Sequence, residues 1–158
     1  MAESKVVIAV DNSVDCVKAV EFALKHFPKG YTYHLIHVSP KPVSDTRLSA
    51  DGGESGMDFQ VKHMLNKEQE TASKDFLQRV FVPKASSAGA KVTASMLHSE
   101  SDGSTSIGQA ICQYVHQAKP DALILMKQNK NAVTRFFIGS VTRYCATECD
   151  IPVVIVPP

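Results

Sequence analysis

Five apolar segments recur along the chain, and each has the length of a β-strand. Residues 5–10 and 122–126 are almost continuous runs of aliphatic side chains, which are typical of strands covered on both faces. Residues 31–38 are rich in aromatic and branched side chains. Residues 90–97 alternate small or polar with apolar positions, which predicts a less buried strand. Residues 151–156 form a branched segment with proline at each end, which favours an edge strand.

The segments between these strands show helical spacing of apolar residues. The longest of them keeps this spacing among Lys, Glu and Gln without an internal Gly or Pro. Four helices are predicted. The first follows the polar residues Asp11 to Ser13, and the others span Met57 to about Val82, Ser106 to Ala118, and Ser140 to Cys149. Strands and helices therefore alternate along the whole sequence.

This alternation predicts an α/β fold, a single doubly wound parallel sheet with helices on both faces. A chain of 158 residues fits one domain, residues 1–158, with a single core. Residues 39–56 combine Ser, Asp, Gly and Pro with little hydrophobicity, so we expect a flexible loop around them. Doubly wound sheets bind ligands at the carboxyl ends of their strands, which directs attention to the polar residues that follow each strand.

Composition narrows the classes of function. The formal net charge is +1 and no run of Lys or Arg exceeds two residues, so the sequence predicts neither nucleic-acid binding nor a membrane surface as partner. No apolar stretch approaches the ~20 residues of a membrane span, and the first residues lack the features of a signal peptide. We therefore expect a cytoplasmic protein whose four cysteines are reduced thiols.

The first candidate for ligand contact is Asp11-Asn12-Ser13, which lies between a predicted strand and a predicted helix. A carboxylate at this place can accept a hydrogen bond from a ribose hydroxyl, or it can simply cap the helix that follows. The second candidate is Gly139-Ser140-Val141. Backbone N–H groups at a helix N-terminus and a Ser hydroxyl suit a phosphate, but the same residues also suit an ordinary helix start. Both alternatives stay open at each place.

Cysteine and histidine spacing gives little support for a metal or an enzyme. Cys145 and Cys149 are four residues apart and could share a metal or form a redox pair, but packed thiols are the simpler interpretation and we predict no metal site. His34 and His37 point to opposite faces of a strand. The common catalytic and phosphate-loop motifs are absent, so we do not expect an enzyme.

The C-terminal third of the sequence resembles the universal stress protein family. That family has a strand, a glycine, two residues, a second glycine, nine residues and then Gly-Ser. Gly139-Ser140 matches the Gly-Ser pair, and the segment from Cys149 to Val156 is similar to the family's closing strand. Counting back from Gly139, the two glycine positions fall on Met126 and Asn129. A loop shorter by one residue would put Lys127 at the first position, so both glycines are missing in either alignment.

The resemblance also implies a strand order, a ligand and a site. The strand order would be 3-2-1-4-5, and ATP or AMP would be the cofactor. Asp11-Asn12-Ser13 resembles the family's Asp-Gly-Ser, whose Asp contacts the nucleoside, and Val38 resembles the valine whose backbone pairs with adenine. The implied nucleotide-binding residues are Asp11, Asn12, Ser13, Val38, Met126, Lys127, Asn129, Gly139, Ser140 and Val141.

These observations predict a stress-response protein that acts as a homodimeric binding module with a degenerate adenine-nucleotide site. The alternative is a competent ATP-binding sensor of the same family, and slow ATP hydrolysis is a third possibility. The homodimer is expected through the strand from Ile151 to Val156, because an apolar edge strand without a charged residue favours pairing with a second copy.

Overall fold

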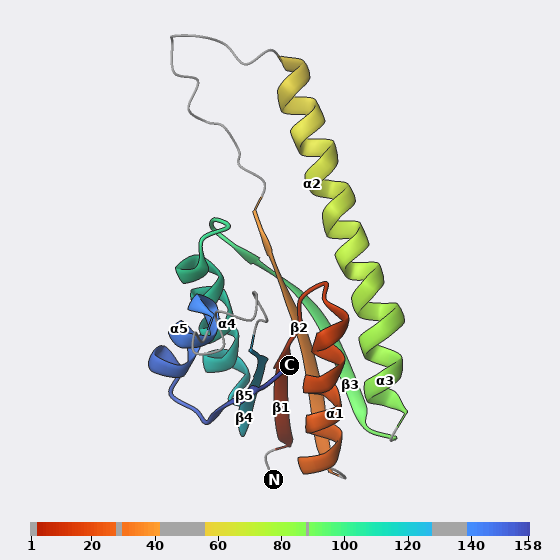
Figure 1. Ribbon diagram of the computed structural model, residues 1–158, viewed down its shortest axis with the longest axis vertical. Helices are drawn as coiled ribbons and strands as arrows, with labels where there is room; N and C mark the ends of the chain where they lie inside the picture. The colour runs from red at the N-terminus through yellow and green to blue at the C-terminus, as the bar shows by residue number, and fades with distance from the viewer. Residues whose placement is uncertain (1–2, 28–29, 42–55, 88, 128–138) are drawn as a thin grey trace.

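The computed structural model describes the chain except for residues 1–2, 28–29, 42–55, 88 and 128–138. Five parallel strands form one sheet in the order β3-β2-β1-β4-β5 (Figure 1). The strands are β1 (Ser4–Ala9), β2 (Tyr31–Pro40), β3 (Lys91–Ser99), β4 (Ala122–Met126) and β5 (Val153–Val156). The predicted α/β fold and the strand order implied by the resemblance are confirmed.

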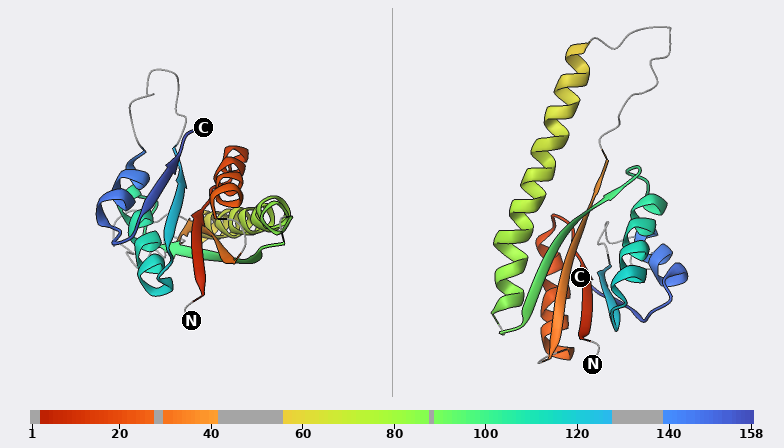
Figure 2. Two further views of the ribbon diagram at one scale, coloured as in Figure 1. Left: turned by 90° about the horizontal axis from the view of Figure 1, so that it is seen from below. Right: turned by 180° about the vertical axis from the view of Figure 1, so that it is seen from behind.

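Helices cover both faces of this sheet, as the view from below in Figure 2 shows. One face carries the helices that precede β2 and β3, and the other face carries the two C-terminal helices. The elements are η1 (Val14–Cys16), α1 (Val17–His26), α2 (Gly56–Phe76), η2 (Leu77–Phe81), α3 (Val82–Ser86), α4 (Ser104–Ala118) and α5 (Ser140–Glu148).

The central strand explains why the apolar runs are continuous. Val6, Val7 and Ile8 of β1 are all fully buried. Successive side chains of a strand point to opposite faces, so Val6 and Ile8 pack in the core under α1 and α3, whereas Val7 packs in the core under α4 and α5. A strand between two helical layers needs apolar side chains on both faces, and this is what the sequence pattern indicated.

The longest predicted helix continues beyond its expected end. It was expected to stop near Val82, before Pro83, but α2 passes through the π-helical turn η2 into α3, which ends at Ser86. Proline is tolerated in the first turn of a helix, and Pro83 occupies that place in α3. Inside a continuous α-helix, Pro83 would remove a backbone hydrogen bond and clash with the preceding turn. The π-helical turn η2 directly before α3 changes the hydrogen-bonding pattern at this point.

The segment expected to be a flexible loop around residues 39–56 is partly regular structure. Strand β2 continues to Pro40, where it pairs with Ser99 of β3, and α2 begins at Gly56. Residues 42–55 lie outside the part of the chain that the structure describes. The strand can extend through Ser39 and Pro40 because β3 is also longer than predicted and supplies the partner positions.

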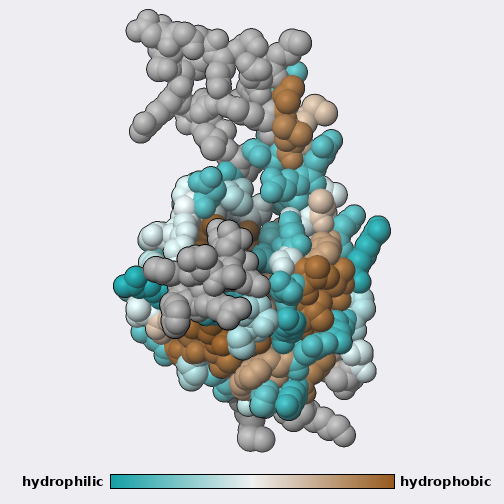
Figure 3. Space-filling view, viewed as in Figure 1, coloured by the Kyte–Doolittle hydropathy of each residue, from teal (hydrophilic) through white to brown (hydrophobic). Residues whose placement is uncertain are grey.

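Helix α2 extends well beyond the end of the sheet (Figure 1). Its first half includes Val61, Met64 and Leu65, which are 52%, 61% and 58% exposed, and Figure 3 shows hydrophobic surface on this part of the helix. Its last turn, from Ser73 to Phe76, directs buried side chains toward the sheet. Among the α2 side chains that the structure describes, those of this last turn are the ones that contribute to the core.

Candidate functional site

The sheet order fixes where a ligand site would lie. Strand β1 pairs with β2 on one side and with β4 on the other, so the chain reverses its winding direction between β1 and β4. Asp11 follows β1 by two residues, and Met126 is the last residue of β4. Crevices at such reversal points are the usual ligand sites of doubly wound sheets. The two segments expected to line the site therefore start at neighbouring strands.

The carboxylate of Asp11 is engaged in the turn that leads into η1. Its Oδ1 accepts a hydrogen bond from the backbone N–H of Ser13 at 2.7 Å and lies 3.1 Å from the Cys16 thiol, which donates to it. The Asp11 N–H in turn points to the Cys16 sulfur at 3.4 Å. Asp11 therefore stabilises the turn before η1, whose N-cap is Ser13, and its contact with a ribose stays a prediction.

Asn12 and Ser13 also have partners within the protein. The Asn12 side-chain amide donates to the Ser73 hydroxyl at 2.8 Å, which ties the loop after β1 to α2. The Ser13 hydroxyl accepts from the Asp15 N–H at 3.2 Å and caps η1. Each side chain of this tripeptide therefore fixes the path of the loop, and a ligand would have to bind to a loop that is already held in place.

Val38 and Met126 lie in the hydrogen-bonded part of the sheet. Val38 pairs with Leu97 and is half-buried in the core under α4, and the neighbouring His37 Nδ1 is 2.9 Å from the carbonyl oxygen of Val10. Met126 pairs with Val156, is 9% exposed and belongs to the core on the opposite face. The first of the two glycine positions is therefore occupied by a core side chain.

Of the remaining expected residues, Lys127 leaves β4 directly and donates its backbone N–H to the Val156 carbonyl at 2.8 Å. Val141 is the second residue of α5 and is half-buried against the core on that face of the sheet. Asn129 lies outside the described residues. In the alignment with a shortened loop, Lys127 takes the first glycine position. That position is then also occupied by a residue whose backbone bonds to β5.

The structure brings together two helix N-termini that the sequence did not connect. The Ser140 hydroxyl donates to the Ser104 hydroxyl at 2.6 Å, and these are the first residues of α5 and α4. The N-cap residues are Gly139 and Gly103, so no cap side chain accepts from the first-turn N–H groups of either helix. Such N–H groups and two hydroxyls are the donors that bind an anion.

A close contact between α4 and α5 holds these two helix starts together. A Cβ atom built on Gly108 of α4 would lie 2.4 Å from Cδ1 and 2.8 Å from Cγ of Tyr144 in α5. Gly108 is buried, and no larger residue fits without moving Tyr144. The sequence predicted Gly108 only as part of a helix, because its spatial neighbour is 36 residues away.

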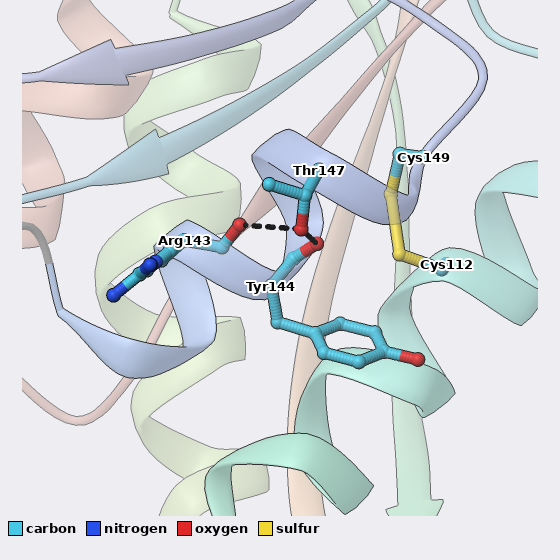
Figure 4. The surroundings of a disulfide bond; sticks show 5 residues. All are labelled: Cys112, Arg143, Tyr144, Thr147 and Cys149. Atoms are coloured by element: carbon cyan, nitrogen blue, oxygen red, sulfur yellow. Dashed lines mark hydrogen bonds between the residues drawn. A yellow bond between two sulfur atoms is a disulfide. The ribbon is translucent and has the colours of Figure 1, made fainter.

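The expectation of four reduced cysteines is wrong. Cys112 of α4 and Cys149, the C-cap of α5, form a disulfide with their Cα atoms 5.5 Å apart (Figure 4). Cys16 and Cys145 are free and buried. Burial raises the pKa of the Cys16 thiol to about 12 and that of Cys145 to about 11. The sequence could not indicate the pairing, because the two cysteines are 37 positions apart and nothing local to either one reports the contact between α4 and α5.

A surface groove elsewhere is formed by one face of α2. It is lined by Met64, Lys67, Glu68, Thr71, Ala72 and Asp75. These residues follow helical spacing and carry charges of both signs, and none of them was expected to contact a ligand. The groove therefore does not belong to the site at the ends of β1 and β4.

The strand order and the reversal between β1 and β4 define a doubly wound α/β protein. The sequence profile of the universal stress protein family matches residues 3–157. The chain therefore belongs to the universal stress protein family. Among the residues that the structure describes, no helix has the length and apolar character needed to cross a membrane.

Solved structures share this fold at low sequence identity. The universal stress protein UspA from Lactobacillus plantarum is 16% identical with a TM-score of 0.69, covering 99% of each chain. The universal stress protein from Archaeoglobus fulgidus in complex with dAMP is 18% identical with a TM-score of 0.54, covering 98% of each chain. A universal stress protein in complex with cAMP is 16% identical with a TM-score of 0.59, covering 99% of this chain and 98% of that one. No curated protein sequence matches this chain.

Proposed function

We propose that this chain is a cytoplasmic, homodimeric binding module with a degenerate adenine-nucleotide site. The observation that carries the nucleotide part is the meeting of the α4 and α5 N-termini through Ser104 and Ser140. The donors of these two helix starts suit a phosphate group. Two members of the family with the same fold are complexed with dAMP and cAMP, which supports an adenine nucleotide as the ligand class.

The degenerate character of the site rests on what replaces the glycines. A glycine allows the backbone to approach a phosphate closely and to adopt positive φ, whereas Met126 has a side chain that packs in the core. Asp102 directly precedes the N-cap of α4, and its negative charge opposes an anion at that helix start. The first-turn donors are thus present, but the sequence has no glycine at either loop position.

The nucleoside end of the proposed site has a similar weakness. Asp11 Oδ1 already accepts from the Ser13 N–H and the Cys16 thiol, so a ribose hydroxyl would have to share this carboxylate with the turn. A ligand that binds without displacing these bonds gains less free energy from Asp11 than a ligand that meets an unoccupied carboxylate. We therefore place the chain nearer to an interaction module than to a tight nucleotide sensor, and we propose no catalytic role.

Calorimetric titration of the full chain with ATP and with AMP tests this proposal. We expect dissociation constants weaker than about 1 μM, which corresponds to less than about 8 kcal/mol of binding free energy. Where binding is measurable, Ser140→Ala should weaken it by about 1–3 kcal/mol through the lost hydrogen bond. Thr147→Ala is the matched control, because the Thr147 hydroxyl donates only to carbonyl groups of its own helix.

Three outcomes would contradict the proposal in different ways. Nanomolar affinity for ATP would overturn the degenerate site and support the competent sensor. Measurable binding that Ser140→Ala leaves unchanged would show that the nucleotide binds elsewhere. Release of ADP from ATP in the same samples, lost together with binding in Ser140→Ala, would support the slow ATPase.

A further inference from the structure

Three cysteines gather where α4 packs against the C-terminal end of α5. The sulfur atoms of Cys112, Cys145 and Cys149 all lie within 4.8 Å of one another. Cys145 is fully buried, whereas Cys112 and Cys149 are half-buried and reach the surface side of the cluster. The cluster lies apart from the Ser104–Ser140 contact, because its members are in the middle of α4 and the last turn of α5.

Contacts other than the disulfide also bring these sulfur atoms together. Cys145 and Cys149 are four residues apart, so they lie on one side of the end of α5. Cys112 is one turn after Gly108, whose missing side chain lets Tyr144 and α5 approach α4 closely. The cluster is therefore built by the fold and is not created by the disulfide alone.

Three thiolates at this spacing are a ligand set for a soft metal ion. Metal–sulfur bonds are ~2.3 Å, so sulfurs that share one ion are roughly 4 Å apart, which small side-chain rotations within the cluster allow. Thiolates select Cu⁺ and Zn²⁺ among biological cations. Among the described residues no other His, Cys, Asp or Glu joins the group, so Cu⁺ would be three-coordinate and Zn²⁺ would add a solvent molecule on the open side.

We propose that the reduced cluster of Cys112, Cys145 and Cys149 binds one thiophilic cation, Cu⁺ or Zn²⁺, through three thiolates. The disulfide and the metal exclude each other because both need the sulfurs of Cys112 and Cys149. Two molecules of a small thiol, such as the cellular thiol pool supplies, reduce the disulfide with two electrons and two protons and leave as one small-molecule disulfide. The three thiols then release three protons to solvent as the cation binds.

The test uses the full chain, reduced and kept without oxygen, and titrates it separately with Cu⁺ and with Zn²⁺ against a coloured competing chelator. We expect one equivalent of at least one of the two ions to bind, with thiolate-to-metal absorption in the ultraviolet if the ion is Cu⁺. Protein with the disulfide intact should bind neither ion at this site. Comparison of the two titrations identifies the cation.

Variants decide whether the cluster is the site. Cys145→Ala and Cys112→Ala should each lower the affinity more than about 100-fold, since even changes outside the ligand set cost ~10–100-fold. Cys16→Ala is the matched control, because Cys16 is also a buried free thiol but lies beside Asp11. Cys149→Ala, at the half-buried end of α5, replaces any variant that fails to fold by circular dichroism.

The proposal is overturned if the reduced protein binds neither ion with one-to-one stoichiometry. It is also overturned if removing Cys145 or Cys112 changes the affinity no more than removing Cys16, or if the oxidised protein binds equally well. Each of these results would leave a structural disulfide beside a packed thiol. None of them bears on nucleotide binding, which is measured independently.

Discussion

Individual residues at the end of β1 hold the loop and could also meet a ligand. Asp11 accepts from the Ser13 N–H at 2.7 Å, and Asn12 donates to Ser73 at 2.8 Å. These bonds are local stabilising contacts of the kind that any helix start can make. Their presence means that a loss of nucleotide binding in an Asp11 variant has to be separated from a loss of stability.

Asp11→Ala should lower the free energy of unfolding even without a nucleotide. The change removes the acceptor for the Ser13 N–H and the Cys16 thiol, and the loss of a hydrogen-bond partner costs about 1–3 kcal/mol. Asp11→Asn keeps a side-chain oxygen at the same place and should lose less. Urea unfolding measures both variants, and equal stability of Asp11→Ala and the parent chain would refute the role of Asp11 in holding this turn.

Gly108→Ala should destabilise the protein although alanine favours helices. The propensity gain is about 1 kcal/mol, but the new Cβ would lie 2.4 Å from the Tyr144 ring, and overpacking costs about 1–3 kcal/mol or more. Thr105→Ala, at an exposed position of the same helix, isolates the propensity effect. A Gly108→Ala variant that gains stability as Thr105→Ala does would show that α4 and α5 do not pack this closely.

At the scale of elements, β5 is an apolar strand at the edge of the sheet. It pairs with β4 on one side only and lies at the edge of the sheet. Within the described part of the chain no strand pairs with its other side, and its four residues are all branched and apolar. Strand β3 at the opposite edge itself contains exposed polar residues such as Lys91 and Thr93, which discourage pairing with another chain.

The expected homodimer through β5 predicts a specific mutational response. Sedimentation or light scattering at micromolar concentration should report about twice the chain mass. Ile155→Lys should shift the chain towards monomer, because Ile155 is half-exposed and lies outside both core clusters. Val154 packs in the core under α1, so Val154→Lys should lower the stability of the fold as well as shift the chain towards monomer.

The control for this experiment is Val14→Lys, which places the same charge at a side chain that is 72% exposed in η1. It should leave the mass unchanged. A parent chain that is monomeric at these concentrations would refute the dimer through β5. A dimer whose mass is unchanged by Ile155→Lys and Val154→Lys would show that the interface is on another surface.

At the scale of the whole molecule, two helical layers bury the sheet and some polar groups with it. His34 lies on the α4 side, where its Nδ1 is 2.9 Å from the Tyr114 hydroxyl. Burial, followed by the positive charge of Lys5, holds the pKa of His34 below its ordinary value. The neutral imidazole is therefore the form that the folded state prefers.

This shift predicts that acid weakens the fold. The pKa of His34 is lower in the folded than in the unfolded chain, so the unfolded chain binds more protons as the pH falls below about 6.5. The stability contribution of His34 is thus complete above that pH and is lost as the pH falls through the folded-state pKa. Urea unfolding between pH 7.5 and pH 5 should show this loss, and His34→Gln should show a smaller one. Equal slopes would rule out His34 as the cause.

The sequence by itself determined the layers of the fold. The continuous apolar run of β1 indicated a strand buried on both faces, and Val6 and Val7 indeed pack on opposite sides. Alternation of strands and helices then leaves few arrangements other than a parallel sheet. Local signals also marked the starts of η1 and α5, because Ser13 and Gly139-Ser140 lie directly at these helix starts.

Only the tertiary structure decided which distant residues meet. Nothing local to Cys112 or Cys149 identifies the other as its partner, and nothing local to Ser104 points to Ser140. These contacts exist because α4 and α5 lie on the same face of the sheet and approach closely at Gly108. Periodicity reports which face of an element is buried, whereas the identity of the neighbour is set by sheet order and helix packing. The candidate sites of this protein depend on the second kind of information.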